Sequence, residues 1–142
     1  MAVIVDIAEE VKTRLQGTAF SRDVTVERGY RPSLERDFEG VLVTVVPAGV
    51  TPNPGESTRG GTLHEYQVDV GVQTRCDTGD VVTLDEMMDL AEQVMDFVAE
   101  TDIRDAHGAK LAAIENEPVY APEHIQDRVF TSIISATYVV RR

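Results

Sequence analysis

The sequence predicts an α+β fold, a mainly antiparallel sheet with two helices packed on one side, in the element order αβββαββ. Two segments carry apolar residues at the spacing of a helix that buries one face. Between them lies a run that alternates apolar and polar residues, which is typical of a strand in an antiparallel sheet. Strands that follow one another along the chain favour the α+β class. The apolar residues of the alternating run are Tyr66, Val68, Val70 and Val72.

The first helix is expected at residues 3–16. Its apolar residues fall at i, i+3, i+4 and i+7, so they form one stripe. Glu10 and Arg14 are spaced for an i, i+4 ion pair, and Gly17 is expected to end the helix. The stripe consists of Ile4, Ile7, Ala8, Val11 and Leu15.

Residues 47–61 are expected to form an extended hairpin loop between strands at 41–46 and 63–74, after a first strand near 23–30. This segment holds 3 of the chain's 6 prolines and 4 of its 10 glycines. Hairpin loops usually have about 2–5 residues, and unstructured loops beyond about 12–15 are mostly functional or disordered. We interpret it as an assembly loop. Its candidate contact residues are Val50, Thr51, Pro52, Asn53, Pro54, Gly55, Glu56 and Arg59.

Thr83 and Glu86 match a capping box and predict a second helix at about 83–101. A strand is expected near 110–115. The chain then passes through a proline-marked connection into a last β-rich run at 129–140, with apolar residues on both faces.

Length and composition indicate one globular domain, residues 1–142. The formal net charge of −12 argues against a surface that binds nucleic acid phosphates. The single cysteine, Cys76, excludes an internal disulfide and a Cys-cluster zinc site. The first residues do not resemble a secretory signal, and no apolar run approaches the roughly 20 residues of a membrane span. We therefore expect a soluble protein made in a cytoplasm, with no membrane partner.

The one catalytic-looking motif is Asp77-Thr78-Gly79, the tripeptide that carries the catalytic aspartate of aspartic proteases. It follows Arg75-Cys76 rather than an apolar strand, and it leads into a helix. A turn that uses Asp and Gly for their backbone geometry explains it better. The hypothesis of a protease requires Asp77 to pair with its symmetry mate in a dimer.

The remaining reactive side chains predict no site. His64 and Cys76 stand twelve residues apart on one predicted strand, about 40 Å at roughly 3.3 Å per residue, so they cannot meet within one subunit unless the chain folds back between them. The three histidines, which include His107 and His124, show no paired metal-ligand spacing. We expect no catalytic residue, no metal and no cofactor, and we expect that the chain is not an enzyme.

Acidic residues dominate the second predicted helix, since the chain has no Lys or Arg between residues 77 and 102. Five of these acids share one helix face. They form either a solvated face or a functional negative surface, which repels nucleic acid or binds a basic partner. The stripe consists of Asp85, Asp89, Glu92, Asp96 and Glu100.

The opposite face of this helix is apolar over about half of its circumference, wider than one sheet covers. The excess packs under the first helix or against a neighbouring subunit. The two-sided last strand also indicates an oligomer. Candidate subunit-interface residues are Met88, Met95, Phe130, Ile133 and Tyr138.

The segment EPVYAPEHIQDRVFTSIISATYVV, residues 117–140, resembles the closing segment of the tail terminator and tail completion (head-tail joining) proteins of long-tailed bacteriophages. In that family a Pro/Tyr-marked connection and a short helix lead into a last strand with a Phe-Thr-Ser-like centre. The order of the other predicted elements is similar to that family's layout. The matching residues are Pro118, Tyr120, Pro122, Phe130, Thr131, Ser132 and Tyr138.

The resemblance implies a structural virion protein, assembled in the host cytoplasm. It implies a homo-oligomeric, hexameric ring at the head-proximal end of the tail tube, which stops tube polymerisation and joins the tail to the head. Its partners are then the tail tube protein, a neck or connector protein, and genomic DNA that passes without specific binding. In such a ring, the acidic stripe is a candidate lining of the lumen. Another neck component, a head-completion or stopper protein, is the alternative, as is an enzyme or binding module with a site built across subunits.

Overall fold

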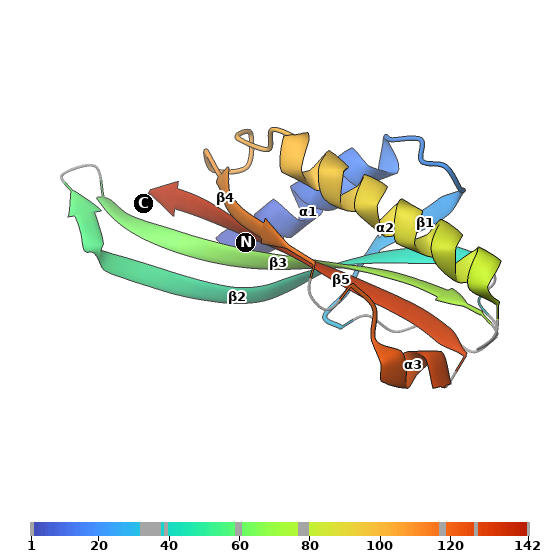
Figure 1. Ribbon diagram of the computed structural model, residues 1–142. Coiled ribbons are helices and arrows are strands. Elements are labelled where there is room, and N and C mark those ends of the chain that lie inside the picture. The colour runs from blue at the N-terminus through green and yellow to red at the C-terminus, as the bar shows by residue number, and fades with distance from the viewer. Residues whose placement is uncertain are drawn as a thin grey trace.

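The computed structural model describes residues 2–31, 38, 40–58, 61–76, 80–116, 119–126 and 128–141, without the side chains of 53–58 and 126. Eight helices and strands follow one another in these residues (Figure 1). They are α1 (Val3–Gln16), β1 (Val24–Arg28), β2 (Val41–Thr58), β3 (Gly61–Arg75), α2 (Val81–Glu100), β4 (Lys110–Glu115), α3 (Pro122–Gln126) and β5 (Val129–Arg141).

The five strands form one mixed sheet in the order β1-β2-β3-β5-β4. β1 pairs with β2 in parallel, and the other three pairings are antiparallel. The two long helices lie on the same face of the sheet, and α3 lies beside the start of β5, beyond the end of β4 (Figure 1). The predicted α+β class is confirmed. The predicted order did not include the short helix α3, and the parallel pairing of β1 was not predicted.

The core fills the space between the two long helices and the sheet. α1 contacts β1, β2 and β3, whereas α2 contacts β5 and β4. The alternation predicted for β3 is confirmed, because all four of its apolar residues are buried. Burying one side chain of this size stabilises the fold by about 1.5–3 kcal/mol. The helices contribute Ile7, Ala8, Val11, Leu15, Met87, Leu90, Ala91, Val94 and Val98.

Helix α1 has the predicted bounds and the predicted termination. The N–H of Gly17 donates to the carbonyl of Thr13 and closes the last turn. Arg14 Nε donates to Glu10 Oε1 at 2.9 Å, as the i, i+4 spacing predicted. Local sequence signals therefore suffice to define this helix.

The predicted capping box at Thr83 and Glu86 is wrong. The helix begins at Val81, and Asp80 is its N-cap. The Thr83 N–H and hydroxyl both donate to the Asp80 carboxylate, at 3.1 and 2.6 Å. These two bonds lower the pKa of Asp80. Asp80 precedes Thr83 by three residues, so it accepts the N–H that lacks a partner within the first turn.

The predicted loop at 47–61 is also wrong, because β2 continues to Thr58 and pairs with β3. Val50 lies opposite Tyr66, and Pro52 lies opposite His64. Prolines are tolerated in strands at sheet edges and at bulges, where no ladder N–H is needed. The ladder shifts register between Pro47 and Gly49, as at a β-bulge.

The buried Tyr138 predicts a loss of stability at alkaline pH. Burial raises the pKa of Tyr138 to about 12, whereas an exposed tyrosine titrates near 10. The unfolded chain therefore loses this proton first, and the free energy of unfolding falls as the pH rises from 10 towards 12. In urea unfolding across this window, Tyr138→Phe is expected to flatten the decline by up to about 1.4 kcal/mol per pH unit. Equal slopes for the two proteins would show that Tyr138 does not titrate in this way.

Candidate functional site

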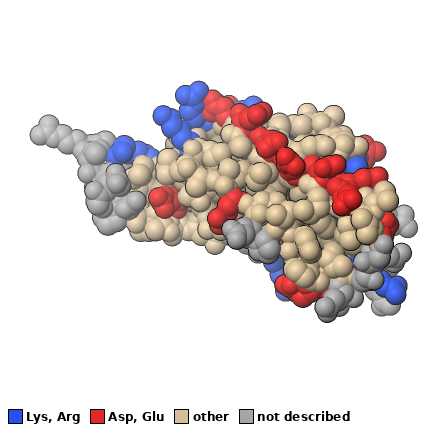
Figure 2. All heavy atoms as spheres, in the orientation of Figure 1, with Lys and Arg blue, Asp and Glu red and all other residues tan. Residues whose placement is uncertain are grey.

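Helix α2 presents the predicted acidic stripe to solvent. All five of its carboxylates are exposed, and in the described part of the chain none of them forms an ion pair. Figure 2 shows acidic side chains as a band along α2. Glu86, beside the stripe, differs because its carboxylate lies 3.3 Å from Arg22 Nη1. The stripe is therefore an unneutralised negative surface.

The arrangement of these acids does not favour the helix. Asp85 and Asp89 are spaced i, i+4, as are Asp96 and Glu100, and like charges at this spacing destabilise a helix. Glu100 also ends the helix, where the macrodipole favours cations, and the last turn contains no basic residue. A role in helix stability thus does not explain the stripe.

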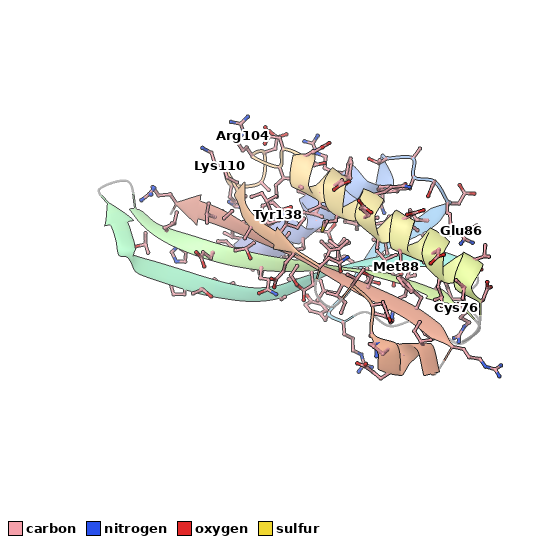
Figure 3. The ribbon with its side chains drawn as sticks, in the orientation of Figure 1. Cys76, Glu86, Met88, Arg104, Lys110 and Tyr138 are labelled. Atoms are coloured by element: carbon pink, nitrogen blue, oxygen red, sulfur yellow. The ribbon has the colours of Figure 1, made fainter. Side chains whose placement is uncertain are left out.

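The apolar face of α2 is only partly covered. Met87 is fully buried, whereas Met88 and Met95 are half-buried. Met88 projects from α2 towards β5 (Figure 3). Two hollows of about 470 and 510 Å³ adjoin it, between α2, β4 and α3. We call them together the groove. Its apolar lining includes Leu84, Met88, Met95, Ile114, Tyr120 and Phe130.

The predicted subunit-interface residues differ in how far they are exposed to solvent. Phe130 and Tyr138 are wrong as surface candidates, because each is 1% exposed within the core. Their positions in β5 alternate towards the helices, so the same period that made them apolar also buries them. Ile133 points to the opposite face and is 37% exposed. Met88 and Met95 line the groove.

The outer part of the β2–β3 hairpin, residues 51–58 and 61–65, projects from the body (Figure 1). We call it the arm. None of its described side chains belongs to the buried core. β1 pairs with β2 only as far as Val45, so among the described residues no strand covers the outer edge of β2 beyond that point. On the other side, the end of β5 pairs with Leu63, His64 and Glu65.

The predicted assembly loop thus belongs mostly to a strand. Val50 is 47% exposed, and Thr51 and Pro52 are also exposed. Asn53, Pro54, Gly55 and Glu56 lie in β2, with side chains outside the described set, and Arg59 lies outside the described residues.

The reactive side chains are dispersed. His64, in the arm, stacks on the buried Tyr66, His107 Nε2 lies 2.7 Å from Asp6 Oδ2, and His124 Nδ1 lies 2.9 Å from Thr131 Oγ1. Within the described ranges, no three His, Cys, Asp or Glu residues are grouped to hold a metal ion.

Cys76 and His64 do not form a common site. Cys76 is buried directly after β3, at the opposite end of that strand from His64. The motif Asp77-Thr78-Gly79, like Pro118, lies outside the described residues. Among the helices that the structure describes, none is long and apolar enough to cross a membrane.

One surface residue was missed in the sequence. Tyr30 follows β1 and is 74% exposed, the largest fraction among the described large hydrophobic side chains. Arg28 lies over its ring, 5.1 Å from the centroid, and also donates to Glu9 Oε1 at 2.6 Å. Two hydrogen bonds of the Arg28 side chain raise the pKa of Arg28: the larger effect comes from the bond to Tyr30 and the smaller from the bond to Glu9. The sequence feature that points to this surface residue is an aromatic residue close to two arginines, in the segment RGYR.

Comparison with known proteins adds no family assignment. No protein-family model matches the chain. No curated protein matches it either.

Neutralising part of the stripe is expected to stabilise the protein. The combined changes Asp89→Asn, Glu92→Gln and Asp96→Asn remove like-charge repulsion worth about 0.2–0.5 kcal/mol per pair. We expect a higher Tm at low ionic strength and a smaller gain at high salt, where the charges are screened. Glu86→Gln serves as the control, because it breaks the contact with Arg22 and brings no such gain. A lower Tm for the triple variant would mean that the stripe supports the fold.

Proposed function

We propose that this chain is the subunit of a ring at the head-proximal end of a phage tail tube. The ring stops tube polymerisation and joins the tail to the head while DNA passes through it. The resemblance of residues 117–140 to the tail terminator and tail completion proteins indicates which assembly the chain belongs to. The arm is the structural observation that carries the proposal.

The arm supports assembly because the core of the subunit does not include its described side chains. Its backbone, by contrast, is paired in a regular ladder. Ordering a residue costs about 1–2 kcal/mol, and the described arm residues place no fully buried side chain in the core to offset this cost. A neighbouring subunit or the tail tube offers the missing contact surface.

The composition of the arm indicates what kind of contact it makes. A free strand edge invites pairing with any other strand, and proline at an edge opposes this. β2 carries Pro47, Pro52 and Pro54 along the part that β1 does not cover. We therefore expect side-chain contacts with a neighbour rather than one continuous intersubunit sheet.

The acidic stripe supports the passage of DNA. Carboxylates that face a lumen repel phosphates, whereas lysines in the same place would bind them. The five carboxylates are exposed and form no ion pair with a described residue, so they are suited to this task. An outward-facing stripe would instead bind a basic partner.

A head-completion or stopper protein of the neck is the second candidate, since it shares the small size and acidity that the sequence shows. Disruption of the gene in the phage that encodes the chain separates the two roles. Overlong tails are expected for a terminator, because nothing then stops polymerisation. Tails of normal length together with leaking filled heads would assign the chain to the neck instead.

Shortening the arm is expected to impair assembly without unfolding the domain. Asn53 and Leu63 face each other in the ladder, so residues 54–62 can be replaced by an Asn-Gly turn between them. Circular dichroism and Tm should stay close to wild type, because β5 keeps its ladder partners Leu63 and His64 and no described core side chain is removed. Complementation of a gene disruption should then fail to restore normal tails. Normal tails from the shortened chain would show that the arm has no role in assembly.

A further inference from the structure

The groove beside α2 has an apolar floor and an acidic rim. Asp85, Asp89, Glu92 and Glu115 all line it, and no Lys or Arg is among its described lining residues. Tyr120, at 44% exposure, adds an open apolar surface. An occupant of this groove therefore needs an apolar or aromatic side chain next to positive charge.

The chain itself carries such a group at Tyr30. Its ring is largely exposed, and the Arg28 guanidinium holds it from one side. Arg31 follows directly and is exposed. Tyrosine and arginine are the residues most often found as the anchors of protein interfaces. A side chain that is already held loses little further conformational entropy on binding.

The groove and Tyr30 lie at opposite edges of the same sheet. Tyr30 follows β1, which is one edge strand, and the groove includes Ile114 and Glu115 of β4, the other edge strand. The two surfaces therefore cannot meet within one subunit. A contact between two copies through them is head-to-tail, and head-to-tail contacts generate rings when the rotation closes.

We propose that Tyr30 of one copy inserts into the groove of the next copy, beside Met88, with Arg31 facing the acidic rim. The occupant is a second copy of this chain, selected by the charge complementarity between Arg31 and four carboxylates. This inference rests on the proposed ring and names the two surfaces that close it. The arm then remains available for a further contact.

Two variants that block opposite surfaces test the contact. Tyr30→Ala removes the anchor and leaves the groove intact, whereas Met88→Arg fills the groove and leaves Tyr30 intact. Each variant alone is expected to associate at least about thirtyfold more weakly than wild type, the effect of losing one anchor side chain. Mixed together, they retain one working contact, so sedimentation velocity at high protein concentration should reveal heterodimers and no larger species.

Two substitutions at exposed positions make the test independent of whether the Met88→Arg variant folds. Asp89→Lys reverses a charge on the groove rim and should act like Met88→Arg. Asp96→Lys makes the same change on the same helix face, outside the groove lining, and should assemble like wild type. Equal effects of these two lysines would indicate general electrostatics and would overturn the proposed contact.

The outcomes also separate this inference from the proposed function. If the wild-type chain forms rings and Tyr30→Ala forms them equally well, the contact is wrong and the ring stands. If the wild-type chain stays monomeric at all concentrations, both are wrong. Rings that Tyr30→Ala and Asp89→Lys both weaken, together with heterodimers from the mixed variants, support the contact.

Discussion

The burial of one face of the sheet, with β3 at its centre, under two helices determines where the other features lie. Val68, Val70 and Val72 are fully buried, and β3 is the central strand that pairs with both β2 and β5. A shift of one residue in either pairing would turn these side chains to the solvent and expose the polar face to the helices. Register is therefore strongly specified in the body, and the same ladder extends outward into the arm.

This constraint also gives α2 two different faces. Because Met87, Leu90 and Val94 must face the sheet, the acidic residues between them face away from it. The apolar face is wider than the sheet that it covers, so Met88 and Met95 remain at the side, where they meet β4 and the segment before β5. The stripe and the groove are thus two consequences of one helix orientation.

Much of the fold was predictable from local pattern, and the errors have physical causes. The α1 bounds followed from its stripe and Gly17, and the β3 alternation needed no tertiary information. The extension of β2 through three prolines was not predictable, since it depends on which edge lies free in the finished sheet. Phe130 and Tyr138 were misassigned because apolar residues at both parities of a strand do not reveal which parity faces the helices. The groove could not be predicted, because it lies between α2, β4 and α3, and the sequence does not show that these three elements lie close together.

The proposed ring follows from the resemblance, the projecting arm and the unneutralised stripe together. Its most direct test is negative-stain electron microscopy of the purified chain at high concentration, because the association of subunits into a ring depends on their concentration. We expect closed hexameric rings with a central pore wide enough for a DNA duplex. Particles no larger than a single chain at every concentration would contradict the ring.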